Sequence, residues 1–62
     1  MTRQTGRIHW YDPLSREGLL KDEAGRLIYF YSENTTLRDG QTVTFRLVQD
    51  YNWMQATDVE GA

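Results

Sequence analysis

Few side chains in this sequence could carry acid–base or nucleophilic chemistry. The chain has one histidine, His9, and no cysteine, so we expect neither a multi-ligand zinc site nor a disulfide. The serines, Ser15 and Ser32, do not stand in the strand–turn–helix elbow that exposes a catalytic serine. The adjacent acids Asp22-Glu23 fall in an expected hairpin turn, where solvated carboxylates are usual. We therefore expect no enzymatic activity, no metal and no cofactor.

Aromatic rings are the chemistry that the chain has in excess. They make up 13% of the residues, with two Trp, four Tyr and two Phe. Rings of this kind either fill a core or offer exposed flat faces for stacking. Their use therefore depends on which of them the fold leaves exposed. Most of them lie in three short clusters: Trp10-Tyr11, Tyr29-Phe30-Tyr31 and Tyr51-Asn52-Trp53.

Length and charge limit the possible architectures and partners. A chain of 62 residues forms one small domain, residues 1–62, which buries roughly 60% of its accessible surface on folding. The net charge of −2 provides no overall positive field for polyanions, although a local face could still be basic. No apolar run is long enough to span a membrane, and we expect no signal peptide because the first residues lack the pattern of one. We expect a cytoplasmic protein without membrane contact.

Alternation with period two predicts strands rather than helices. In residues 42–48, Val43, Phe45 and Leu47 share one face, while polar residues alternate with them. Similar reasoning predicts strands over residues 5–11, 17–22, 27–32 and 53–59. Asp12-Pro13 and Gly25 are typical turn residues between them. Five short strands joined by tight turns predict a small antiparallel barrel without helix.

Five segments are similar to segments of one family. Residues 6–12 (Gly-Arg-Ile-His-Trp-Tyr-Asp) resemble the opening strand of bacterial cold-shock proteins, Gly-Lys-Val-Lys-Trp-Phe-Asn. Residues 16–20 and 27–32 fall on the family's ribonucleoprotein motifs, Gly-Phe-Gly-Phe-Ile and Val-Phe-Val-His-Phe-Ser. Residues 37–45 and 55–59 are similar to Leu-x-x-Gly-Gln-x-Val-x-Phe and Gln-Ala-x-Asn-Val. The resemblance implies an all-β, five-stranded antiparallel Greek-key barrel of the OB type.

The resemblance also implies a function, which is binding of single-stranded RNA or DNA by base stacking on the sheet. Trp10 matches the family's stacking tryptophan, and Phe30 stands where the family has a binding histidine. Tyr29 is then expected to face the core. The residues expected to contact nucleic acid are His9, Trp10, Leu19, Ile28, Phe30, Tyr31, Asn52 and Trp53.

Departures from the family pattern predict weaker binding. Glu17 and Leu19 replace the two phenylalanines of the first motif, and Glu17 places a negative charge on a face meant for phosphates. Ile28 replaces an outward phenylalanine of the second motif. About half of the stacking platform is retained.

Other roles for these residues remain open at this stage. Trp10 could be a core residue, Trp53 could plug the end of the barrel, and His9 could be an ordinary solvated strand residue. An outward strip of Leu19, Ile28 and Phe30 would instead suit protein contact, including a homodimer. Protein–protein contact is therefore the alternative to nucleic-acid binding.

Overall fold

The computed structural model describes residues 3–62, which form five β-strands and no helix. The strands are β1 (Gln4–Asp12), β2 (Glu17–Asp22), β3 (Leu27–Tyr31), β4 (Thr42–Gln49) and β5 (Met54–Gly61). Each strand agrees with its predicted range to within two residues at either end. The all-β prediction is therefore confirmed.

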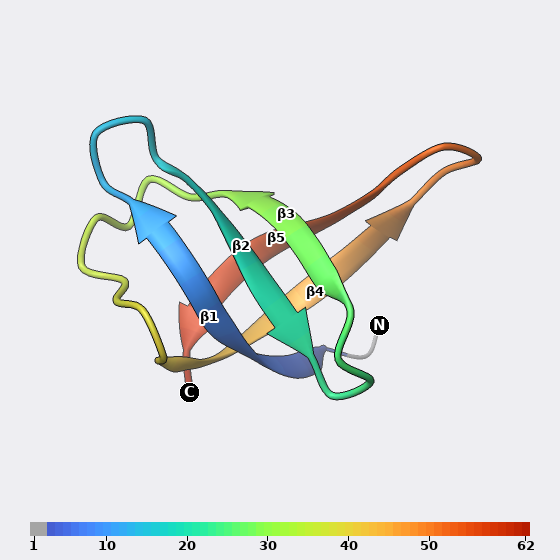
Figure 1. Ribbon diagram of the computed structural model, residues 1–62, viewed down its shortest axis with the longest axis horizontal. Coiled ribbons are helices and arrows are strands. Elements are labelled where there is room, and N and C mark those ends of the chain that lie inside the picture. The colour runs from blue at the N-terminus through green and yellow to red at the C-terminus, as the bar shows by residue number, and fades with distance from the viewer. Residues whose placement is uncertain (1–2) are drawn as a thin grey trace.

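The strands close into a barrel in the order β1-β2-β3-β5-β4. The strands β1, β2 and β3 lie in front in Figure 1, with β4 and β5 behind them. Four of the pairings are antiparallel, but β3 and β5 pair in parallel through Tyr29 opposite Gln55 and Phe30 opposite Ala56. The prediction of an entirely antiparallel barrel is therefore wrong at this seam.

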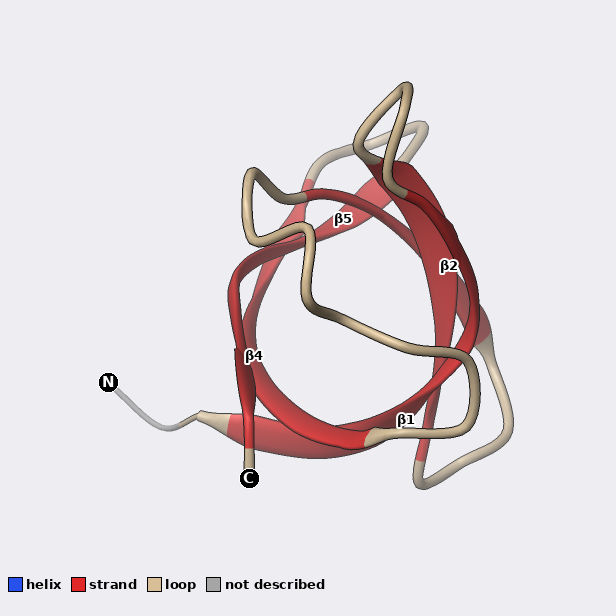
Figure 2. Cartoon of the chain, turned by 90° about the vertical axis from the view of Figure 1, so that its left-hand side faces the viewer, coloured by secondary structure: helices blue, strands red, loops and turns tan. Residues whose placement is uncertain are grey.

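The connection between β3 and β4 explains the parallel pair. Figure 2 shows this connection crossing the end of the barrel before β4 begins beside β1. The hairpin that follows brings β5 back along β3 in the same direction. Leu37, in the middle of the connection, is buried and packs with the core. The connection therefore also covers one end of the barrel.

The interior of the barrel is apolar and draws on every strand. As predicted, Val43 and Phe45 face inward, and Leu47 packs against the buried cluster. In β3, however, the buried residues are Ile28 and Phe30, whereas Tyr29 is 38% exposed. The buried cluster consists of Ile8, Tyr11, Leu20, Ile28, Phe30, Leu37, Val43, Phe45, Ala56 and Val59.

Small neighbours on both sides explain why Phe30 lies inside. Phe30 pairs with Gly18 on β2 and with Ala56 on β5, so its ring has space over both backbones. A Cβ atom on Gly18 would lie only 2.8 Å from Cζ of Phe30. The ring also stacks on Tyr11 with a centroid distance of 5.7 Å. The predicted outward orientation of Ile28 and Phe30, and the predicted inward orientation of Tyr29, are therefore wrong.

The hairpin between β2 and β3 shows one further difference from expectation. Gly25 adopts a positive φ of 86°, as its turn position predicts. Asp22, expected to be a solvated turn residue, is instead buried. Its carboxylate accepts hydrogen bonds from the backbone N–H groups of Ala24 and Arg26 and forms an ion pair with the Arg26 guanidinium at 2.8 Å. These partners compensate for the burial of the charge.

Candidate functional site

The outward side of β1, β2 and β3 carries three exposed rings on a continuous sheet. Trp10 is 41% exposed, Tyr29 38% and Tyr31 47%. The register pairs Trp10 with Leu19 and Leu19 with Tyr29, so these side chains form one row across the three strands. Glu17 and Tyr31 are paired in the next row. We call this surface the aromatic face: Trp10, Glu17, Leu19, Tyr29 and Tyr31.

A β-bulge in β1 turns Trp10 outward. The register with β2 shifts between Ile8 and Trp10, so His9 is an extra residue in the ladder. His9 and Trp10 are consequently both exposed, while Ile8 and Tyr11 on either side are buried. Strict alternation would have placed Trp10 with Ile8 in the core. The bulge therefore decides the orientation of Trp10, which the sequence left open between the core and the surface.

The spacing of the rings follows from the geometry of the sheet. Tyr29 and Tyr31 are two residues apart on β3, which separates them by roughly 7 Å along the strand. Trp10 and Tyr29 are separated by β2, and hence by roughly 10 Å across the sheet. Each ring can therefore meet a different planar group of a ligand. Leu19 lies between Trp10 and Tyr29 and supplies apolar contact.

Glu17 is tied to the aromatic face by a hydrogen bond. The hydroxyl group of Tyr29 donates to Oε1 of Glu17 at 2.9 Å. This hydrogen bond, together with burial, raises the pKa of Tyr29 above the ordinary value for tyrosine. Tyr29 is protonated at neutral pH, as an ordinary tyrosine is, and so its hydroxyl can donate this hydrogen bond. The carboxylate is held beside the rings, not extended into solvent.

Two basic residues lie at the other end of the same sheet. Arg7 on β1 pairs with Lys21 on β2, one row beyond Trp10 and Leu19. Both are exposed, and within residues 3–62 neither forms an ion pair. They line an open depression of about 220 Å³ together with Thr5, Gly6, Asp22, Glu23 and Thr42. Arg7 and Lys21 therefore lie at one end of the sheet, close to Glu23, and Glu17 lies at the other end, next to the exposed Arg16.

The structure brings four of the predicted contact residues together. His9, Trp10 and Tyr31 are exposed, and Leu19 is half-buried on the same side of the sheet. Ile28 and Phe30 are 1% and 0% exposed, and so they cannot meet a ligand on this surface.

Asn52 and Trp53 lie apart from the aromatic face, in the hairpin that joins β4 to β5. This hairpin extends away from the barrel in Figure 1. Trp53 is 48% exposed, so it is a surface aromatic and does not plug the barrel. Val48 and Tyr51 of the same hairpin are also exposed, at 42% and 100%.

Sequence reasoning missed Tyr29 as a member of the face. The useful signal was Gly18, which follows Glu17 in β2. A glycine on the inward side leaves space for a large ring on the neighbouring strand, and Phe30 occupies that space. With Phe30 inside, Tyr29 and Tyr31 must both face outward.

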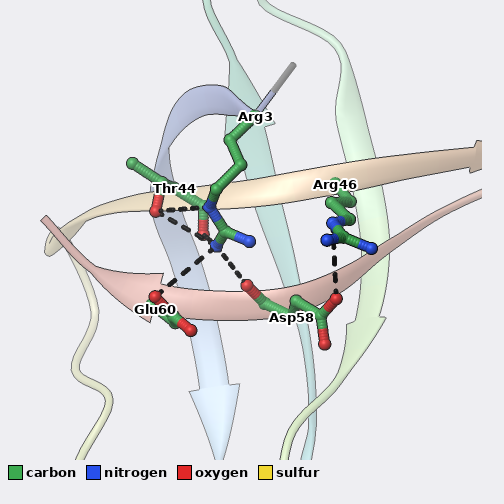
Figure 3. Close-up of polar contacts among 5 residues, drawn as sticks. All are labelled: Arg3, Thr44, Arg46, Asp58 and Glu60. Atoms are coloured by element: carbon green, nitrogen blue, oxygen red, sulfur yellow. Dashed lines mark hydrogen bonds and ion pairs between the residues drawn. The ribbon is translucent and has the colours of Figure 1, made fainter. Parts of the chain in front are cut away.

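A second polar cluster, on β4 and β5, is structural. Figure 3 shows Arg3 donating to the side chain and carbonyl of Thr44 and to the carbonyl of Asp58. Arg3 also lies 3.9 Å from a carboxylate oxygen of Glu60, and Arg46 lies 3.6 Å from Asp58. These contacts cross the bulge between Thr44 and Arg46. The two arginines of this cluster are paired with two carboxylates, and their contacts connect the N-terminal segment, β4 and β5.

Comparisons with known proteins place the chain in no family. No family model matches the sequence, and no curated protein matches it. Among residues 3–62, no group of three or more His, Cys, Asp or Glu side chains could hold a metal ion. The described part of the chain also contains no helix of the length and apolarity needed to cross a membrane.

Proposed function

We propose that the protein binds single-stranded nucleic acid by stacking bases on the aromatic face. The observation that carries this proposal is the set of three exposed rings on one side of the sheet: Trp10 on β1, and Tyr29 and Tyr31 on β3. Base–aromatic stacking contributes about 1–3 kcal/mol per base and tolerates any base, because every base has a π-face. RNA and DNA both offer such bases.

The strand order supports an OB-type Greek-key barrel of the cold-shock kind. In such barrels the face of the second and third strands binds oligonucleotides, and β2 and β3 carry most of the aromatic face here. The resemblance fits the observed burial when the family's Val-Phe-Val-His is placed on residues 28–31. Its valines then fall on the buried Ile28 and Phe30, and its binding side chains fall on the exposed Tyr29 and Tyr31.

The distribution of charge suggests how the backbone of the ligand runs. Arg7 and Lys21 are available for phosphates at one end of the sheet, whereas Glu17 repels phosphates at the other. Two neutralised phosphates give a slope of about −1.4 in log K against log salt for a single strand. We propose that base stacking contributes more to binding than ionic contacts do.

The alternative of protein contact is less well supported by this structure. Its homodimer form relied on an outward strip of Leu19, Ile28 and Phe30, and the last two residues lie in the core. A homodimer through that strip would need the barrel to unfold. We therefore favour nucleic acid as the partner of this face.

Fluorescence titration with a thymidine heptamer tests the proposal. The substitution Trp53→Phe leaves Trp10 as the only tryptophan, so that its emission reports on the aromatic face alone. We expect quenching with a Kd of about 1–100 μM at physiological salt. The substitution Tyr31→Ala should weaken binding by about 1–3 kcal/mol. Tyr51→Ala, at the hairpin tip, is the matched control and should have no effect.

Two results would reject the proposal. One is the absence of quenching and binding at protein concentrations well above the expected Kd. The other is unchanged affinity in both Tyr31→Ala and Trp10→Ala, measured by the anisotropy of a dye-labelled heptamer, when circular dichroism shows that the barrel is intact.

A further inference from the structure

Glu17 is the feature of the aromatic face that stacking does not explain. A carboxylate repels the phosphates of any nucleic-acid strand that crosses the sheet, yet this one lies beside the rings of Tyr29 and Tyr31. It pairs with Tyr31 across the ladder and accepts a hydrogen bond from Tyr29. Within the described chain it has no arginine, lysine or histidine as an ion-pair partner.

Most of the hydrogen-bonding capacity of Glu17 is unused. An ionised carboxylate has about four acceptor positions on its two oxygens. The hydroxyl of Tyr29 takes one of them, on Oε1. The hydrogen bond also fixes the direction of the carboxylate, which reduces the entropy lost when a ligand binds. Glu17 is therefore a preoriented acceptor beside two stacking surfaces.

Only one common base presents two adjacent donors to such an acceptor. Guanine carries N1–H and the N2 amino group side by side on its Watson–Crick edge. Adenine and cytosine each combine one amino donor with a ring-nitrogen acceptor on that edge. Thymine and uracil place their single N3–H between two carbonyl oxygens, which a carboxylate repels. A carboxylate can therefore form a bidentate, charge-assisted pair of hydrogen bonds with guanine. Such pairs are stronger than single hydrogen bonds between neutral groups, and their geometry makes them more selective.

We infer that the aromatic face prefers guanine at one position, where Glu17 accepts hydrogen bonds from N1–H and N2–H of a base stacked beside Tyr29 and Tyr31. This inference rests on the proposed function and adds base selectivity to it. The two hydrogen bonds offset the repulsion that Glu17 exerts on neighbouring phosphates. Stacking on Trp10 remains independent of base identity, and the phosphates stay nearer Arg7 and Lys21.

The test uses thymidine heptamers in which a single guanine is moved through the five internal positions. One guanine per strand avoids multi-strand guanine structures. We expect one position to bind about tenfold tighter than the all-thymidine strand, within the range that one two-pronged base contact provides. Replacing that guanine by hypoxanthine, which lacks the N2 amino group, should remove most of the gain.

Glu17→Gln is the matched protein variant. Its amide oxygen can still accept from Tyr29, so the barrel is retained, but it cannot accept from two donors with a full charge. In Glu17→Gln the all-thymidine strand should bind somewhat tighter, and the guanine strand should lose its advantage. Circular dichroism and the urea midpoint confirm that the variant is folded.

The outcomes separate this inference from the proposed function. If thymidine and guanine strands bind equally at every position, the guanine preference is wrong and stacking stands. A guanine advantage that survives Glu17→Gln also overturns the assignment to Glu17. If no strand binds the wild-type protein, the proposed function itself fails, and the inference fails with it.

Discussion

Gly18→Ala is the perturbation that tests the orientation of the whole aromatic face. Gly18 lies in β2 opposite Phe30, and a Cβ atom at this position would lie 2.5 Å from the carbonyl oxygen of Trp10 and 2.8 Å from Cζ of Phe30. Both distances are well below van der Waals contact. The first neighbour is backbone and the second is a ring packed in the core, so neither can move freely.

The expected cost follows from these contacts. Adding one methyl group to a well-packed interior costs about 1–3 kcal/mol, and we expect the upper half of this range because the backbone must shift. In a domain of this size, about 2–3 kcal/mol corresponds to a fall in Tm of roughly 8–24 °C. The total stability expected for 62 residues is only about 3–9 kcal/mol. A loss of about 2–3 kcal/mol is therefore a large fraction of the total stability and should be readily measured by urea unfolding.

A double-mutant cycle with Phe30→Leu isolates the contact between the two side chains. If the Phe30 ring lies over Gly18, its removal should cost less in the Gly18→Ala background than in the wild type, with a coupling of at least about 0.5 kcal/mol. Urea unfolding followed by circular dichroism gives the free energies. Equal m-values would show that all variants unfold from barrels of similar compactness.

Gly61→Ala is the control for replacing a strand glycine. A Cβ atom on Gly61 would meet only the terminal amide of Gln41, which is flexible and can move away. We expect a change within about 0.5 kcal/mol. If Gly18→Ala is as mild as this control, or if the double mutant is strictly additive, Phe30 does not lie over Gly18. Tyr29 and Tyr31 would then lose their assigned outward orientation.

Three further predictions concern charged and titrating groups. Glu17→Phe should add a stacking ring and tighten binding of a thymidine heptamer by about 1–3 kcal/mol, with Glu17→Gln between it and the wild type, as anisotropy titrations will show. The gain from losing the charge should be larger at low salt. Burial alone would raise the pKa of Asp22, but hydrogen bonds from the Arg26 and Ala24 backbone and the Arg26 side chain lower it on balance. The unfolded chain then binds more protons, so this stabilisation is complete above the unfolded pKa and is lost as pH falls through the folded one. Urea midpoints at neutral and acidic pH should therefore differ less in Asp22→Asn than in the wild type. Finally, Glu17→Gln should lower the pKa of Tyr29 toward its ordinary value, which ultraviolet titration of the phenols can measure.

The strand ranges and the all-β class could be predicted because they depend on local patterns. Val43 and Phe45 alternate with polar residues, which indicates a strand, and Gly25 is a residue type that favours a turn. Each of these elements is therefore specified by residues that are close together in the sequence. The parallel pairing of β3 with β5 depends on the path of the long connection across the barrel end. Local alternation carries no information about such a path.

The wrong prediction that Ile28 and Phe30 face outward has a different origin from the wrong prediction of strand direction. Three consecutive aromatics fit either phase of a strand, and a one-residue shift in the comparison with the cold-shock motif exchanges inside and outside. The phase is decided by Gly18 and Ala56 on the two adjacent strands, and that information is not local to β3. The outward turn of Trp10 likewise depends on a bulge, which periodicity does not predict.

The parallel pairing of β3 with β5 is the place where we expect the barrel to open locally most often. Only two residue pairs define its register, Tyr29 with Gln55 and Phe30 with Ala56, whereas the β1–β2 and β4–β5 ladders run over most of their strands. Local opening has the lowest free energy where the fewest backbone hydrogen bonds must break, so amide hydrogens at this seam should exchange with solvent before those of the other ladders. Tyr29 belongs both to the seam and to the aromatic face. A single-stranded nucleic acid bound over Tyr29 would consequently slow amide exchange at the seam. Slower exchange of the β5 amides would then report that a ligand is bound on the aromatic face, although this face lies on β1, β2 and β3.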